Sequence, residues 1–333
     1  MSHIEPGKPL ATFLVCSYNQ EKTIHLAIEG ALAQTYSPLE IIISDDCSTD
    51  NTYEIARRTV AAYGGPHTVI VNRNPENLGL TRHVNRVFEL AKGELILGSA
   101  GDDISFPNRT ECLMEAYMRS GKGPALIHSN VEAIDQEGRT LDMRSPPVEK
   151  RKMTMEQIAT SEAIYIGATA AFSRELLTAF GPIIHNRSFE DLVWGFRAAI
   201  VDRLIYVNAP LVHYRVGTGL SSYDPCKLSW REFLARLSDR RMIQIDVLKQ
   251  RLLDLDSMRL ASHSHLRKAV RARINTEMAR HSLLNHIRGN APELANQTTI
   301  TNLVALALEL RAIGGYLVKC GIGGLIHKLK LRN

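Results

Sequence analysis

Residues 39–52, LEIIISDDCSTDNT, join an apolar run typical of a buried strand to a polar stretch that starts at Asp45. The isoleucines favour extended structure, whereas Asp and Ser are common where a helix starts. We therefore predict a strand over 39–44, a loop over 45–50 and a helix over 52–63. A strand that passes through a polar loop into a helix is the first half of a βαβ unit.

The same alternation recurs on both sides of this stretch. Apolar runs predict strands over 11–16, 68–72 and 94–98, and helical spacing predicts helices over 21–34 and 80–91. This order indicates an α/β fold, a Rossmann-like and mostly parallel sheet flanked by helices, with ligands at the carboxyl ends of its strands.

The pattern loosens after Pro107. Apolar runs still predict a strand over 125–134, and helical spacing predicts helices over 154–161 and 189–201. An apolar segment covers 163–172, for which we predict no element. Residues 207–214 are expected to form an edge strand, because Pro210 interrupts them.

The chain has 333 residues, of which 44% are hydrophobic and 23% charged, a balance typical of a globular protein. Its charge is uneven, since residues 225–333 hold 19 basic and 8 acidic side chains whereas residues 1–224 hold 21 and 27. From Trp230 onward apolar residues recur at helical spacing. We therefore predict an α/β domain over 1–224 and a basic helical region over 225–333.

The five cysteines are odd in number and widely spaced, without a Cys-x-x-Cys pair. This favours a reducing, cytoplasmic location over a disulfide framework or a zinc ribbon. No signal peptide and no spanning helix are expected, since the longest apolar stretch, 300–326, is interrupted by Glu309, Arg311 and Lys319.

Polar residues follow the first two predicted strands. They are Ser17, Tyr18 and Asn19 after the first strand, and Asp45 and Asp46 after the second. A carboxylate at this edge can accept hydrogen bonds from a nucleotide base or a ribose. Each residue alone is also explained by turn and cap geometry.

Asp102 and Asp103 directly follow the strand predicted over 94–98. Adjacent carboxylates suit a hard cation such as Mg²⁺ or Mn²⁺, which completes its shell with water and phosphate oxygens. The alternative is a turn in which one of them caps the next helix.

Asp191 lies in the first turn of an apolar helix that starts near Phe189. It could act as a general base toward a hydroxyl if it faces the same cleft, but the helix dipole alone also favours an acid there.

His213 and Arg215 precede a glycine-containing loop over 216–222. Histidine can ligate a metal and arginine can bind phosphate through its fork of donors. A flexible loop before the helical region explains the glycines equally well, and Arg215 is the stronger functional candidate.

These clusters, in this order, resemble the family 2 glycosyltransferases of the GT-A fold. The resemblance covers residues 10–222. The stretch 14–19 (LVCSYN) resembles the family's first-strand motif, 40–52 its second strand and aspartate loop, 77–80 (NLGL) its Asn-x-Gly turn, and 93–94 the approach to its metal motif.

The resemblance implies a role for each cluster. Asp45 or Asp46 would bind the base or ribose of a nucleotide, Asp102 would hold the divalent cation on the diphosphate, and Asp191 would be the catalytic base. One position departs from the family pattern: Ala100 stands where an Asp-x-Asp-Asp motif has its first carboxylate.

From the resemblance we expect an inverting glycosyltransferase. It would move a sugar from a UDP-, GDP- or dTDP-sugar to a saccharide or lipid-linked acceptor, with Mn²⁺ or Mg²⁺, in surface polysaccharide biosynthesis. The residue types fit this chemistry, because a cation on Asp102 and Arg215 would neutralise the departing diphosphate while Asp191 takes the acceptor's proton.

Two other classes stay open. A non-catalytic nucleotide-sugar-binding protein or scaffold is permitted by Ala100, although Asp102 and Asp191 argue for turnover. The nucleotidyltransferase class is the less favoured alternative, because no Gly-rich loop with Lys or Arg follows the first strand.

The basic region over 225–333 allows several partners. Peripheral contact with anionic lipid and a solvated helical face are equally expected, and residues 314–333 are the best local candidate for lipid contact. Nucleic acid is not expected, since few aromatics accompany the charge. Apolar helical stripes could also form a homodimer interface.

Overall fold

The computed structural model describes residues 7–142, 153–161, 164–217, 227–258, 263–288 and 308–314. The chain forms two compact units, residues 1–220 and residues 221–333. The predicted loop after Gly217 and nearly all of the predicted lipid-contact segment 314–333 lie outside the described residues.

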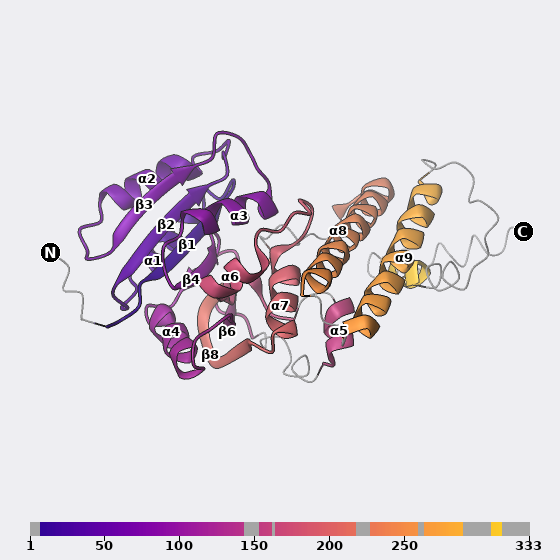
Figure 1. Cartoon of the computed structure of the whole chain (residues 1–333). Coiled ribbons are helices and arrows are strands. Elements are labelled where there is room, and N and C mark those ends of the chain that lie inside the picture. Colours follow the sequence, from indigo (N-terminus) through magenta and orange to yellow (C-terminus); the bar gives the residue numbers. More distant parts are fainter. Residues whose placement is uncertain are drawn as a thin grey trace, which may run out of the picture. The chain divides into compact units, whose positions relative to one another are not determined.

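The first part of the first unit alternates strands with helices, as the sequence predicts (Figure 1). In chain order the elements are β1 (Ala11–Ser17), α1 (Ile24–Leu32), β2 (Leu39–Asp45), α2 (Thr52–Ala61), β3 (Thr68–Arg73), α3 (Leu80–Leu90) and β4 (Leu95–Ala100).

The second part contains two very short strands, two long strands and four helices in its described residues. Its elements are β5 (Ile104–Ser105), α4 (Arg109–Arg119), β6 (Leu126–Ile134), α5 (Met155–Thr160), the 3-10 turn η2 (Gly167–Thr169), β7 (Ala171–Ser173), α6 (Arg174–Phe180), α7 (Glu190–Ile200) and β8 (Leu204–Arg215).

All eight strands form one sheet, in the order β3-β2-β1-β4-β7-β6-β8-β5. β1 to β4 pair in parallel, β7 runs antiparallel to β4 and β6, and β6 pairs in parallel with β8. The predicted α/β class with a mostly parallel sheet is therefore confirmed. The carboxyl ends of β1, β2, β4, β6 and β8 lie at one edge of the sheet.

The prediction of an edge strand over 207–214 is wrong. β8 has a neighbour on both sides, β6 and the two-residue edge strand β5. Pro210 is accommodated because the register between β6 and β8 shifts at Asn130, which pairs with it, so the missing N–H falls at an irregularity in the ladder.

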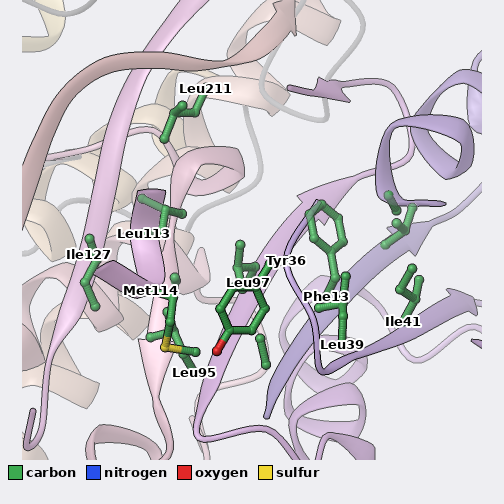
Figure 2. Close-up of a cluster of buried hydrophobic side chains, with 14 of the residues drawn as sticks. Phe13, Tyr36, Leu39, Ile41, Leu95, Leu97, Leu113, Met114, Ile127 and Leu211 are labelled. Atoms are coloured by element: carbon green, nitrogen blue, oxygen red, sulfur yellow. The ribbon is translucent and has the colours of Figure 1, made fainter. Parts of the chain in front are cut away.

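Apolar side chains cover both faces of the sheet. On one face, strand residues such as Phe13, Ile41 and Leu97 pack with α1, α2 and α4, and Figure 2 shows Leu113 and Met114 of α4 within this cluster. Burial of this apolar surface supplies the main driving force for the fold.

On the other face, Leu14, Ile42 and Ile96 pack against Val87 and Ala91 at the end of α3. An aromatic group lies beside them, in which Phe88, Phe172 and Trp194 make edge contacts at centroid distances of 5.2 to 5.8 Å. This group joins α3 and α7 to the sheet.

The second unit is built on two long helices, α8 (Trp230–Ser257) and α9 (Ser264–Ile287). Their shared interior holds an ion network: Arg241 and Arg280 pair with both Glu277 and Glu309, and the two glutamates are fully buried. Ser229 and Glu232 form a capping box at the start of α8.

None of the helices within the described ranges is long and apolar enough to cross a lipid bilayer.

Candidate active site

The loop after β2 is fixed by its first aspartate. Asp45 is 1% exposed and accepts hydrogen bonds from the main-chain N–H of Ser48 (2.9 Å) and from its hydroxyl. The Nε atom of Arg73, at the end of β3, lies 3.5 Å from the Asp45 carboxylate. Arg73 is partly exposed, so Asp45 and Arg73 form a charged pair at the rim of the sheet edge.

Asp46 faces the loop between β3 and α3. Its carboxylate accepts hydrogen bonds from the Asn74 side chain (2.8 Å) and from the main-chain N–H groups of Leu78 and Gly79 (2.9 Å each). Gly79 has a φ of 74° and precedes α3, a backbone region that favours glycine. Asp46 therefore fixes the start of α3, whereas Asp45 is held by Ser48 and Arg73 within the loop after β2.

The residues after β1 join this loop. Asn19 accepts a hydrogen bond of 2.9 Å from the Thr49 N–H and donates its own N–H to the Ser48 hydroxyl. Ser17 is buried and donates to the Ser44 carbonyl, whereas Tyr18 is 40% exposed. The structure thus brings the two predicted nucleotide-contact clusters together.

The turn formed by Gly101, Asp102 and Asp103, which we call the cation turn, directly follows β4. Gly101 donates its N–H to the Cys16 carbonyl, and a Cβ atom on it would lie 2.5 Å from the Gln20 side chain, so a larger residue would displace the turn. Asp102 and Asp103 are 7% and 2% exposed. Burial, followed by the charge of Asp102, raises the pKa of Asp103 to about 8, and Arg109 and Arg215 oppose this rise.

Arg215 holds this turn in place through hydrogen bonds. Its main-chain N–H donates to Asp103 Oδ1 (2.8 Å), and its guanidinium donates to the carbonyls of Asp102, Asp135 and Gln136 at 2.8 to 3.0 Å. The side chain is 3% exposed. Its predicted contact with a diphosphate stays a prediction, and its observed contacts position the cation turn.

His213 lies on the strand pair β5–β8, opposite Ile104. Its ring is 4.5 Å from the ring of Phe106, and its Nδ1 atom is 3.4 Å from Glu132. It borders an open cavity of about 420 Å³ between α1 and β5. His213 thus contacts Phe106 and lies near Glu132, whereas the Asp102 carbonyl contacts Arg215. The role of His213 as a metal ligand stays a prediction.

The donor set can be tested against a divalent cation. Within the described residues, no three His, Cys, Asp or Glu side chains gather in a metal-binding group. Two adjacent carboxylates nevertheless fit a hard cation, because Mg²⁺ takes one or two carboxylates and completes its shell with water and substrate phosphates. Asp102 and Asp103 supply that set, with one oxygen of Asp103 already bound by Arg215.

The first turn of α7 carries Glu190 and Asp191. The preceding segment is fixed by α3, where Thr81 donates to the Ser188 carbonyl and Asn85 exchanges two hydrogen bonds with Ile183. Since Asp46 fixes the start of α3, the aspartate loop and the start of α7 belong to one hydrogen-bonded arrangement.

Electrostatic neighbours show that the clusters converge. The pKa of Tyr214 is raised by burial and by the charges of Asp103, Asp102 and Asp191 in turn. Burial raises the pKa of Cys16, at the end of β1, to about 12, with contributions from Glu190 and Asp46. The cation turn, the aspartate loop and the acids of α7 therefore surround one site.

Sequence reasoning missed Tyr214, Arg73, Arg109 and Tyr165. Strand alternation could have indicated Tyr214, since it lies between His213 and Arg215 and must face the opposite side of β8 from both. Arg109 is fully buried and donates to the Gly98 carbonyl (2.7 Å) and the Ser105 hydroxyl (2.8 Å), and burial lowers its pKa to about 9. No local sequence signal distinguishes it from a surface arginine.

Comparison with known proteins defines the class. A family model described as glycosyl transferase family 2 matches residues 12–181, which contain the aspartate loop and the cation turn. An uncharacterized glycosyltransferase of Rickettsia typhi is 26% identical over 246 residues, which are 71% of this chain and 75% of that protein.

Two solved structures share the fold. TarS 1-349 of S. aureus, in complex with UDP-GlcNAc, matches with a TM-score of 0.51 and 17% identity over 84% of this chain and 87% of that one. The mannosyltransferase PcManGT of Pyrobaculum calidifontis, in complex with GDP-Man and Mn2+, matches with a TM-score of 0.54 and 17% identity over 98% and 90%.

The fold and the family match define a glycosyltransferase with a GT-A type sheet. The chain belongs to glycosyl transferase family 2.

Proposed function

We propose that this chain is an inverting glycosyltransferase that moves a sugar from a nucleoside-diphosphate donor to a saccharide or lipid-linked acceptor. The observation that carries the proposal is made at Tyr214 on β8, whose pKa is raised by burial and then by the charges of Asp103, Asp102 and Asp191, so that the cation turn and Asp191 both lie near this side chain. A leaving diphosphate needs positive charge, which a cation on Asp102 and Asp103 would supply, and an attacking hydroxyl needs a base, which Asp191 would supply.

The donor would bind at the edge formed by β1, β2 and β4. Asp45 or Asp46 is the candidate for the base or ribose, with Arg73 beside Asp45 and the exposed Tyr18 at the end of β1. TarS and PcManGT, which share this fold, were solved in complex with UDP-GlcNAc and GDP-Man, which supports a nucleotide-sugar donor here. The sugar and the base are left open by these contacts.

Asp102, with Asp103, would hold Mn²⁺ or Mg²⁺, which supplies positive charge to the departing diphosphate. The Mn2+ in the PcManGT complex supports this choice. Arg215 contributes by fixing the turn, since its guanidinium is occupied by three carbonyls.

Asp191 would accept the proton of the acceptor hydroxyl as its oxygen attacks the anomeric carbon from the face opposite the leaving group. One displacement of this kind inverts the configuration, through an oxocarbenium-like state. The helix N-terminus of α7 stabilises the ionised form that a base requires.

The test combines binding with turnover. Thermal shift against a panel of nucleoside diphosphates and nucleotide sugars, with and without Mn²⁺, should give metal-dependent stabilisation by one nucleotide that Asp102→Ala loses. Asp191→Asn should keep this binding and lose transfer by about 10²-fold or more. Binding without turnover in the wild type, under every donor and acceptor tried, would favour the non-catalytic alternative.

The acceptor and location are further parts of the proposal. A role in surface polysaccharide assembly, in the cytoplasm, would bring the enzyme to anionic lipid. The solvent-facing side of α9 carries Lys268 and Arg271, while the one acid of α9, Glu277, is buried. Sedimentation with anionic and with neutral vesicles tests this contact, and ultracentrifugation tests the proposed homodimer.

A further inference from the structure

Glu190 and Asp191, the first two residues of α7, lie in a confined space. Phe189, which precedes them, gives no side-chain cap, and Gly167 of η2 packs against both acids. A Cβ atom on Gly167 would lie 3.2 Å from Glu190 Oε1 and 3.4 Å from Asp191 Cβ. The packing therefore confines the Glu190 carboxylate on the side of Gly167, while the residue as a whole is partly exposed.

Two polar atoms beside these acids lack hydrogen-bond partners. Glu190 Oε2 is shielded from solvent, and so is the hydroxyl of Tyr165, whose side chain is 5% exposed. An ionised carboxylate with a buried, unpartnered oxygen is costly, whereas the neutral acid costs far less.

The groups that face Glu190 do not compensate a negative charge. Asp191 follows it on α7, and the pKa values of the Cys16 thiol on β1 and of Tyr165 before η2 are raised by burial and, in addition, by the charge of Glu190. Each of these side chains is neutral or anionic near neutral pH. The surroundings therefore favour one charge, and not two, at the start of α7.

We propose that Glu190 holds a proton in the working enzyme and is a positioning residue that leaves Asp191 as the single anion at the start of α7. This inference rests on the proposed function for the role of Asp191, but the protonation of Glu190 is independent of it. In the transfer step the acceptor's proton passes to Asp191, and Glu190 keeps its own.

The titration of Glu190 supports the geometry. Burial, followed by the charge of Asp191, raises the pKa of Glu190 to about 8. The helix N-terminus favours a negative charge, and Asp191 carries it when Glu190 is protonated. Glu190 thereby keeps its proton, and Asp191 is left to act as the base.

The direct test observes the proton. Protein labelled with ¹³C at the glutamate δ-carbon is titrated by NMR, and the Glu190 signal is identified by its absence in Glu190→Gln. We expect a midpoint near 8. A midpoint near the ordinary glutamate value of about 4.3 would overturn the proposal.

A second signature addresses the positioning role. The side-chain carbon of Asp191, identified by its loss in Asp191→Asn, should respond to the ionisation of Glu190 near pH 8 in the wild type. This step should vanish in Glu190→Gln. If the step persists, Glu190 does not control the charge beside Asp191, and the positioning role fails.

Activity provides the third readout. Glu190→Gln keeps a neutral side chain of the same shape at every pH, so the variant should lose the step near pH 8 that ionisation of Glu190 gives the wild-type profile of kcat against pH, whereas Asp191→Asn loses about 10²-fold or more throughout. Glu156→Gln, in the exposed first turn of α5, is the matched control. Equal losses in Glu190→Gln and Asp191→Asn would mean that the ionised form of Glu190 is needed. If no donor supports transfer, the proposed function fails while the NMR titration still decides the state of Glu190.

Discussion

The main-chain N–H of Gly79 donates a hydrogen bond of 2.9 Å to the carboxylate of Asp46. This bond connects the loop after β2 to the start of α3, and α3 in turn holds the segment that leads to Asp191. Asp46, for which the sequence predicts ligand binding, therefore also fixes the segment before the proposed base, Asp191, which lies 145 residues further along the chain.

We expect Asp46→Ala to lower the free energy of unfolding of the first unit by about 1 to 3 kcal/mol, because the buried Asn74 side chain and two partly buried main-chain N–H groups lose a charged acceptor. Urea unfolding followed by Trp194 fluorescence, in a Trp230→Phe background, measures this unit separately. Glu76→Ala, an exposed position in the same loop, is the control and should change stability by less than about 0.5 kcal/mol. Equal effects of the two variants would contradict the assigned role of Asp46.

Gly195→Ala tests the contact between α7 and Tyr165. The added Cβ would lie 2.9 Å from Ile164 Cγ1 and from Tyr165 Cε1, so the two side chains must shift. We expect a loss of about 1 to 3 kcal/mol in stability, measured as above. Gly64→Ala, where nothing lies within 4 Å of the added atom, should be close to neutral. A neutral Gly195→Ala would show that this packing is loose.

The raised pKa of Glu190 predicts a pH dependence of stability. Between the unfolded value of about 4.3 and the folded value of about 8, the folded state binds more protons, so this group lowers stability as pH rises through that window. Glu190→Gln removes the effect. Its stability relative to wild type should therefore increase by about 1 to 3 kcal/mol from pH 4.5 to pH 8. Parallel stability curves in urea would refute it.

Glu277→Gln tests the ion network of the second unit. Glu277 is fully buried and pairs with Arg241, Arg273 and Arg280. Loss of its charge leaves buried arginines under-compensated, and we expect about 3 to 5 kcal/mol of destabilisation in the helical unfolding transition seen by circular dichroism. Asp239→Asn, on the exposed side of α8, is the control. A loss below that of the control would mean that Glu309 alone suffices.

The elements that the sequence predicts best are those with strong local patterns. β1 to β4 and the helices between them follow from apolar periodicity, because each buries a continuous stripe. The short strands β5 and β7 were missed, since two or three residues carry no period and their pairing depends on partners far along the chain.

The sequence predicts which residues form the site, but it does not predict the contacts that they make. The sequence indicates that Asp45, Asp46, Asp102 and Asp191 follow strand ends or start a helix, and the structure brings these clusters to one edge. It does not indicate that Asp46 faces the amides of Leu78 and Gly79, or that Arg215 faces carbonyls near residue 135. Such choices depend on tertiary neighbours that local propensity does not encode.

The bond between the Arg215 N–H and Asp103 spans 112 residues of sequence. As the chain leaves the ribosome, β1 to β4 can pair and collapse long before Arg215 has been made. Until β8 has been made, the cation turn lacks the hydrogen bonds from Arg215. The buried carboxyl of Asp103 then also lacks the N–H donor that Arg215 supplies. The turn that would hold the cation in the proposed donor site is therefore completed late, and a nascent chain that ends before β8 contains Asp102 and Asp103 without the donor that holds them in place.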